Sequence, residues 1–211
     1  MFQLLGIPVT IHWTFWLIMA IIGGADQART AEDWLRVGLF LLAGAISVLV
    51  HEFGHALTGR RFGAIRPSVY LQGMGGLCTF QHSAFRRWQD FLVTFAGPLA
   101  GYTLAVLSIL ALGVFPDDGP PLILFLLQTL LLVNLVWSTL NLFPILPLDG
   151  GHMLRATLGP RRLRITLMIS MVTSMICVIP ALYFGSYIGA ILFAYFAWEN
   201  AKDWKLLARH R

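Results

Sequence analysis

Three residues in the stretch VLVHEFGHALTGRR, residues 48–61, have the types and spacing needed to bind a metal ion and activate water. His51 and His55 are one helical turn apart, so both imidazoles project from one helix face and can share an ion. Glu52 is close enough to reach a water molecule at that ion. This is the H-E-x-x-H spacing, in which the histidines bind zinc and the glutamate is a general base. The stretch therefore predicts a zinc site with a base beside it.

A third protein ligand is needed, because a catalytic zinc site usually has three of them and an open fourth position. Asp149, in the stretch NLFPILPLDGGH at residues 141–152, is the strongest candidate, since it is an acidic residue in a mostly apolar stretch. The prolines of this stretch interrupt a helix and its glycines permit a tight turn, which would let the carboxylate turn inward. The alternative role for Asp149 is an N-cap on a helix that begins near Gly151. The cost of burying a carboxylate in a membrane favours the ligand.

The composition places these groups inside a membrane protein. Of the 211 residues, 57% are hydrophobic and 12% are charged, whereas soluble domains carry about a quarter charged residues. Apolar segments follow one another without a linker or a repeat, so we expect a single domain over residues 1–211. The two cysteines, Cys78 and Cys177, lie far apart in apolar surroundings, which disfavours a disulfide scaffold or a cysteine zinc site.

Hydropathy predicts an all-α membrane protein with about six transmembrane helices, because about 20 apolar helical residues cross the hydrocarbon core of a bilayer. The first span is short and contains His12, so it could be partly interfacial. It lacks the basic start and the cleavage site of a signal peptide, and we expect it to be retained. The predicted spans are residues 11–24, 36–58, 88–115, 121–143, 163–181 and 183–203.

Residues 62–83, between the second and third spans, follow a different pattern. Glycines separate short runs such as PSVYLQG and GGLCTF, which favours β-hairpins over helix. We therefore expect a small β-hairpin or sheet insertion at this point of the chain.

The basic residues predict the orientation in the membrane. With a cytoplasmic N-terminus, 13 of the 15 Lys and Arg residues fall on the cytoplasmic side, and only Arg29 and Arg36 fall outside, as the positive-inside rule expects. Both termini would then be cytoplasmic, and His55 would lie roughly 8 Å below the cytoplasmic end of its helix, inside the bilayer. Anionic lipid headgroups explain the net charge of +5, so we expect the lipid bilayer as a partner and no nucleic acid.

Metal binding has to be weighed against chance and against transport. A short motif can arise by chance, and a histidine in a membrane helix is often a core residue or a relay in a transporter. Two histidines and a glutamate on one membrane helix would each need a partner, because polar groups are costly at this depth, and one zinc ion would satisfy all three. A zinc or proton transporter that uses the same ligands is the alternative function. The candidate ligands gather at one depth near the cytoplasm, which disfavours transport.

Two motifs occur in a fixed order along the chain. HEFGH lies on a predicted membrane helix, and two spans later the pattern N-x-x-P-x-x-x-x-D-G matches Asn141, Pro144, Asp149 and Gly150. Together with the stretches GIPVTIHW, GMGGL and AGPLAG, they make the chain resemble the site-2 protease family of intramembrane zinc metalloproteases.

The resemblance implies a role for each matching residue. His51, His55 and Asp149 would ligate one zinc ion per chain, Glu52 would be the catalytic base, and Asn141 would help to hold the substrate or the oxyanion. Some relatives carry a PDZ domain and others a CBS domain, and neither fits in this chain. The expected form is therefore minimal, and regulation or substrate capture would rely on the membrane core or on a separate partner such as a regulatory membrane protein.

The resemblance also implies a substrate class. We expect a metalloendopeptidase of a prokaryotic cell membrane that cleaves transmembrane proteins or peptides in or near their membrane segments, as in regulated intramembrane proteolysis. A helical substrate must unwind before it can be cut. Residues 69–80, with Gly75 and Gly76, could accept the unwound segment as an added strand.

Two further sets of residues leave alternatives open. Glu199 and Asp203 are a rival source of the third ligand, because some other membrane zinc proteases use an E-x-x-x-D helix, although an amphipathic surface helix explains this charged segment better. His152 lies one turn beyond Asp149, where it either supports that carboxylate or simply begins a helix.

Overall fold

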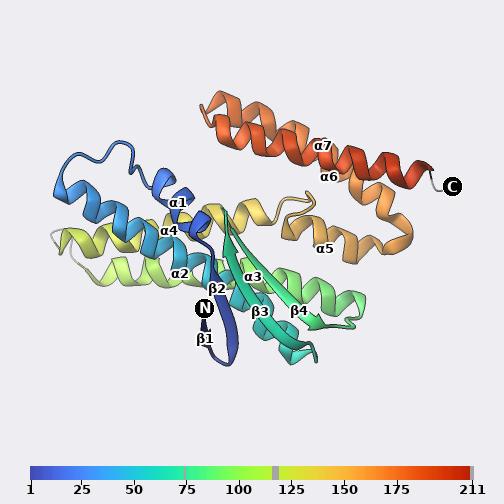
Figure 1. Ribbon diagram of the computed structural model, residues 1–211, viewed down its shortest axis with the longest axis horizontal. Coiled ribbons are helices and arrows are strands. Elements are labelled where there is room, and N and C mark those ends of the chain that lie inside the picture. The colour runs from blue at the N-terminus through green and yellow to red at the C-terminus, as the bar shows by residue number, and fades with distance from the viewer. Residues whose placement is uncertain (74, 116–118, 210–211) are drawn as a thin grey trace. The chain divides into compact units, whose positions relative to one another are not determined.

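The computed structural model describes residues 1–73, 75–115 and 119–209, and most of them are helical. The chain divides into two compact units: residues Met1–Ala84 with Ala96–Ser138, and residues Phe85–Phe95 with Thr139–Arg211. In chain order the elements are β1 (Phe2–Leu4), β2 (Ile7–Ile11), α1 (Trp13–Ile22), α2 (Ala31–Arg61), β3 (Ile65–Gln72), β4 (Gly75–His82), α3 (Arg87–Val114), α4 (Pro121–Asn141), α5 (Asp149–Leu158), the 3-10 turn η1 (Pro160–Arg162), α6 (Leu163–Tyr183) and α7 (Tyr187–Arg209) (Figure 1).

Four of the described helical segments are long and apolar enough to cross a membrane, namely α2, α3, α4 and the stretch Pro160–Tyr183 that contains α6. Helix α1 is apolar but only 10 residues long. Helix α7 is longer, but charged residues occupy its second half. The protein is thus mostly helical with four candidate spans and a small four-stranded sheet, while the count of six spans stays a prediction.

Helix α2, which carries the H-E-x-x-H motif, begins before the predicted span 36–58. A capping box starts it: the Asp33 backbone N–H donates to Thr30 Oγ1 over 3.1 Å, and the Thr30 backbone N–H donates to Asp33 Oδ2 over 2.8 Å. These bonds satisfy N–H groups that a helix start leaves open. Arg60 and Arg61 in the last turn complement the helix dipole. Local capping chemistry therefore sets the length of this helix.

The sheet has the order β1-β2-β3-β4 and combines two distant parts of the chain. Strands β1 and β2 pair antiparallel, as do β3 and β4, whereas β2 and β3 run parallel with Val9 opposite Val69. Alternate side chains point inward, as the twofold period of a strand requires. Those of Ile7, Val9, Val69 and Leu71 are buried against α2 residues in the core of the first unit.

The two N-terminal strands were not predicted from the sequence. The expected first span, residues 11–24, begins at the last residue of β2, and α1 covers only Trp13–Ile22. His12 lies between the two elements and is the N-cap of α1, where its side chain accepts a hydrogen bond from the Thr14 backbone N–H over 3.4 Å. The run GIPVTI is apolar because it forms a buried strand, which hydropathy alone does not distinguish from the edge of a membrane helix.

In the second unit, α6 and α7 lie along each other (Figure 1). A tight turn joins them at Gly185, whose φ of 72° favours glycine. The Gly185 backbone N–H donates to the Leu182 carbonyl over 3.0 Å, and the Ser186 backbone N–H donates to the Ala181 carbonyl over 2.8 Å. The helix pair supports the irregular segment that leads into α5.

Candidate metal centre

His51, Glu52 and His55 are buried on α2. Their exposed fractions are 3%, 4% and 8%, respectively. The two imidazole rings have centroids 4.9 Å apart and an interplanar angle of 78°. This is the one-turn neighbourhood that the helical spacing predicts. Both histidines and the glutamate therefore lie inside the protein and not on its lipid-facing surface.

A glycine of α3 lets that helix approach both imidazoles closely. A Cβ atom at Gly97 would lie 2.9 Å from His51 Nε2 and closer still to His55 Nε2. The backbone of α3 therefore lies against both rings, and no side chain fits between them at position 97. A larger residue here would push the imidazoles away from their present positions. The close approach of α3 to α2 explains Gly97 in the stretch AGPLAG, one of the stretches behind the family resemblance.

A second glycine, on β4, makes room for the carboxylate of Glu52. A Cβ atom at Gly76 would lie 2.6 Å from Glu52 Cδ, so a larger residue at this position would displace the carboxylate. Strand β4 thus passes directly over the acidic side chain. Burial raises the pKa of the nearby Cys78 thiol to about 12, and the negative charge of Glu52 adds to the rise. Cys78 is therefore a neutral thiol at physiological pH, and a thiol binds metal ions well only as the thiolate.

Asp149 is the first residue of α5, in the second unit. The residue at the N-cap position of α5 is Leu148, so Asp149 is the first helical residue and not the N-cap. The glycines after it are required by packing: a Cβ atom at Gly151 would lie 2.6 Å from the Ile145 carbonyl oxygen. Helix α4 ends at Asn141, ahead of the prolines of the stretch, as their missing N–H groups dictate.

Two polar side chains hold the segment before Asp149. Asn200 donates from Nδ2 to the Leu146 carbonyl over 2.7 Å, and the Leu146 backbone N–H donates to Ser170 Oγ over 3.1 Å. Both come from the helix pair α6 and α7. Irregular backbone at membrane depth has to be satisfied by protein groups in this way.

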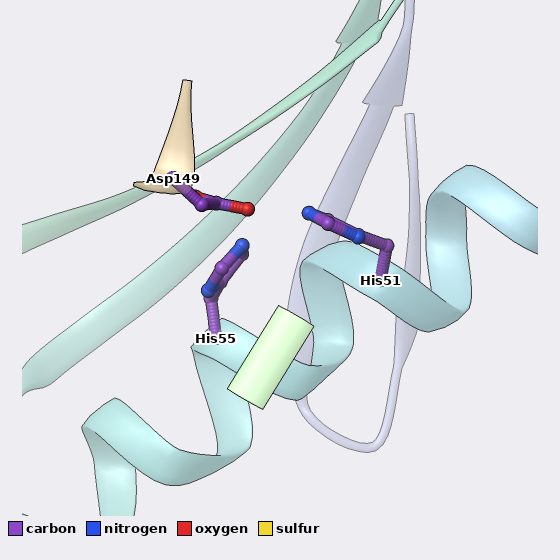
Figure 2. A group of neighbouring side chains, drawn as sticks. All are labelled: His51, His55 and Asp149. Carbon is purple, nitrogen blue, oxygen red and sulfur yellow. The ribbon is translucent and has the colours of Figure 1, made fainter. Parts of the chain in front are cut away.

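His51, His55 and Asp149 each offer one ligand atom, and these atoms lie within 4.8 Å of one another. Figure 2 shows the carboxylate and the two ring nitrogens directed toward one another. Two imidazoles and a carboxylate are a ligand set that zinc accepts in hydrolytic enzymes. The group contains the three ligands predicted from the sequence, and it is a candidate metal centre.

The remaining candidates have other surroundings. Glu199 lies 3.7 Å from the ammonium group of Lys202, and within the described residues neither Glu199 nor Asp203 is part of a group of metal-ligating side chains. Asn141 is the half-buried last residue of α4. His152 is also half-buried. Burial and the nearby Arg155 guanidinium lower its pKa, and the Asp149 carboxylate only partly offsets this effect.

Comparisons with known proteins agree with this arrangement. Residues 39–118 and 121–180 match the model of peptidase family M50. The chain is 29% identical over 163 residues to zinc metalloprotease MJ0392 of Methanocaldococcus jannaschii. The matched region covers 76% of this chain and 45% of the relative. The chain is also 30% identical over 172 residues to the putative zinc metalloprotease Rip3 of Mycobacterium tuberculosis. This matched region covers 75% of this chain and 43% of the relative. The chain thus spans less than half the length of these relatives.

A solved structure is also similar. The site-2 protease from Methanocaldococcus jannaschii matches with a TM-score of 0.68 and 25% identity, over 96% of this chain and 93% of that one. The similarity therefore extends over nearly the whole chain.

Proposed function

Because the chain belongs to peptidase family M50, we propose that it is an intramembrane zinc metalloprotease that hydrolyses peptide bonds in or near transmembrane segments of other proteins. The observation that carries the proposal is the group of His51, His55 and Asp149, with Glu52 buried beside it. The family does not favour the alternative of a zinc or proton transporter.

In this proposal His51, His55 and Asp149 hold the zinc ion. Buried ionisable groups on a membrane helix are costly unless they have partners, and a shared ion offsets that cost for both imidazoles. When bound, zinc polarises the scissile carbonyl and makes a water molecule more acidic. The ligand atoms of the three side chains, which lie within 4.8 Å of one another, support this assignment.

Glu52 is the proposed general base. Its carboxylate would take a proton from the attacking water as the new C–O bond forms, and it would pass that proton to the amide nitrogen as the C–N bond breaks. The buried position of Glu52 and the close passage of β4 would limit how much bulk water reaches it. Asn141 would stabilise the charge on the carbonyl oxygen or hold the substrate.

The edge of the sheet is the proposed substrate-binding element. Strand β4 is the last strand of the described sheet, and it carries Gly75 and Gly76. An unwound substrate segment could pair with this edge, so that its backbone groups stay satisfied away from water. Because Gly76 adjoins Glu52, a strand at this edge would bring its peptide bonds near the base.

The proposed chemistry is tested with Glu52→Gln in the purified full chain. We expect cleavage of a single-span membrane substrate to fall on the order of 10²–10⁴-fold, while the zinc content stays at one ion per chain. Membrane proteins that accumulate in cells with the variant, but not with the native protein, would identify natural substrates. Full cleavage by Glu52→Gln would refute the role of Glu52, and zinc flux into proteoliposomes that persists in this variant would favour transport instead.

The proposed substrate edge is tested with proline substitutions at the two ends of the sheet. Cys78→Pro removes a backbone N–H from the free side of β4, because pairs alternate along the ladder from Gln72 and Gly75 at the hairpin, and Gln3→Pro removes one from β1 at the opposite edge. We expect KM to rise roughly tenfold for Cys78→Pro, the loss of about one hydrogen bond to the substrate, and to stay unchanged for Gln3→Pro. Equal effects of the two prolines would mean that the substrate does not add to β4.

A further inference from the structure

A hollow lined by arginines lies at the C-terminal end of α5, in the second unit and apart from the residues of the metal centre. Its volume is about 490 Å³, which is within the range of small-molecule sites. Arg161 and Arg162 of η1 are exposed and contribute two positive charges. The lining also includes Arg87, Thr157, Gly159 and Pro160.

The third cation of this hollow is held rigidly. Arg87 donates from Nε to the Ala156 carbonyl over 2.9 Å and from a terminal nitrogen to the Thr157 carbonyl. Its guanidinium lies against Gly159, where a Cβ atom would come within 3.0 Å of Arg87 Cζ. Gly159 has a φ of 81°, so both its conformation and its packing require glycine. A fixed positive charge therefore closes the last turn of α5, where carbonyl groups favour a cation.

An apolar hollow of about 440 Å³ adjoins the arginine-lined one. The two share Arg87 and Thr157 in their linings. On α3 the apolar hollow is lined by residues 87, 88, 91 and 92, which form one stripe on a helix face. The stripe runs from a charged residue at the helix start to Phe91 and Leu92 one turn further along. Trp88 and Leu92 are 54% and 40% exposed, so a large apolar surface is left uncovered.

We propose that the paired hollows bind one anionic phospholipid, with its phosphate at Arg161 and Arg162 and an acyl chain along Phe91 and Leu92. The order of charged and apolar lining along α3 matches the order of headgroup and chain in a lipid. Helix α3 is long and apolar enough to span a membrane and begins at Arg87, so the arginines would lie at headgroup level. Arginines and tryptophans at the start of a span are typical of the membrane interface.

The chemistry favours an anionic lipid over other ligands of this surface. A zwitterionic headgroup would bring its own cation near three guanidinium groups, which is unfavourable. A soluble phosphate would use the arginines but leave the apolar hollow uncovered. Clustered basic side chains at a membrane surface bind anionic lipids more tightly with each added charge. The inference does not depend on zinc or on proteolysis.

The test measures lipid binding to the purified, delipidated full chain in detergent by native mass spectrometry. Dioleoyl phosphatidylglycerol, dioleoyl phosphatidylcholine and inorganic phosphate are titrated separately. We expect one phosphatidylglycerol per chain, weaker binding of phosphatidylcholine, and no competition by phosphate at equal concentration. In R161Q/R162Q the Kd should rise roughly 30-fold, the factor expected for two cationic side chains at a lipid surface.

Matched controls separate the site from general charge and apolarity. R61Q/R66Q removes the same charge from exposed arginines elsewhere and should leave the Kd unchanged. Leu92→Gln should weaken binding about tenfold, whereas Leu99→Gln, at another exposed position of α3, should not. Three results would each overturn the proposal: equal Kd values for the two lipids, a loss of phosphatidylglycerol affinity in R61Q/R66Q as large as that in R161Q/R162Q, or displacement of the lipid by phosphate.

Discussion

Helices α2 and α6 both have membrane length, and each carries a stripe of buried polar residues at the same spacing. On α2 the stripe is Ser47, His51 and His55, and on α6 it is Thr166, Ser170 and Ser174. Residues four apart lie on one helix face, so both stripes point inward. Spacing alone therefore does not distinguish a metal site from buried polar residues that only help helices to pack.

The difference lies in how each type of side chain can be satisfied. The Ser174 hydroxyl donates to the Ser170 carbonyl of its own helix over 2.7 Å, and Ser170 Oγ accepts from the Leu146 backbone N–H. Small hydroxyl groups can thus be buried in a membrane helix without a ligand, and they bring helices and loops together. An imidazole is too large for this local solution, so buried histidines indicate a partner such as a metal ion.

Removing a proposed ligand from the α2 stripe should have the largest effect. We expect His55→Ala to weaken zinc binding more than 100-fold, beyond the range seen when groups outside the ligand shell are removed. Metal analysis after dialysis against a graded series of chelators measures this loss. Ser174→Ala, on the α6 stripe, should retain one zinc ion per chain. If both variants lost zinc equally, the distinction between the two stripes would be wrong.

The next largest effect should come from the proposed third ligand. Asp149→Ala should also lose most of its zinc, because only two protein ligands would remain. Glu199→Ala is the matched control, since Glu199 lies near Lys202 and in no metal-ligating group of the described residues. Zinc stoichiometry of both variants, measured side by side, decides between the two carboxylates. Zinc loss in Glu199→Ala alone would transfer the ligand role to α7.

A smaller effect should follow from filling the space beside the imidazoles. Gly97→Ala places a methyl group against both Nε2 atoms, so we expect zinc affinity to fall about 10- to 100-fold, the range for changes outside the ligand shell that misplace a ligand. Gly113→Ala on the same helix meets no atom within 4 Å and should bind zinc normally. Zinc titration of the two variants makes the comparison. Native affinity in Gly97→Ala would show that a glycine is not needed here.

The smallest effect should be a loss of stability from the α6 stripe. Ser170→Ala removes the acceptor of the Leu146 N–H, so we expect the free energy of unfolding in detergent to fall by about 1 kcal/mol. The Ser174 hydroxyl donates to the Ser170 carbonyl of its own helix, so Ser174→Ala should change stability less. Denaturation followed by circular dichroism measures both. A larger loss in Ser174→Ala would contradict this account.

Much of the candidate site could be predicted because its information is local. The H-E-x-x-H spacing needs only a helix to bring two imidazoles together, and apolar segments identify helices whatever they pack against. The prolines after Asn141 end α4 by removing N–H groups, which is also a local effect. The strands β1 and β2 were missed for the opposite reason. The parallel pairing of Val9 with Val69 joins residues far apart in the sequence, and no local pattern encodes it.

The amino-acid sequence by itself determined which residues could serve as ligands and base, and which segments are apolar enough to enter a membrane. Only the tertiary structure decided that Gly97 and Gly76 leave room for the histidines and for Glu52, and that Asp149 is the first residue of α5, after Leu148 at the N-cap position. The physical reason is the range of the interactions. Helix periodicity and hydropathy depend on neighbours along the chain, whereas open space beside a side chain depends on segments that meet only after folding.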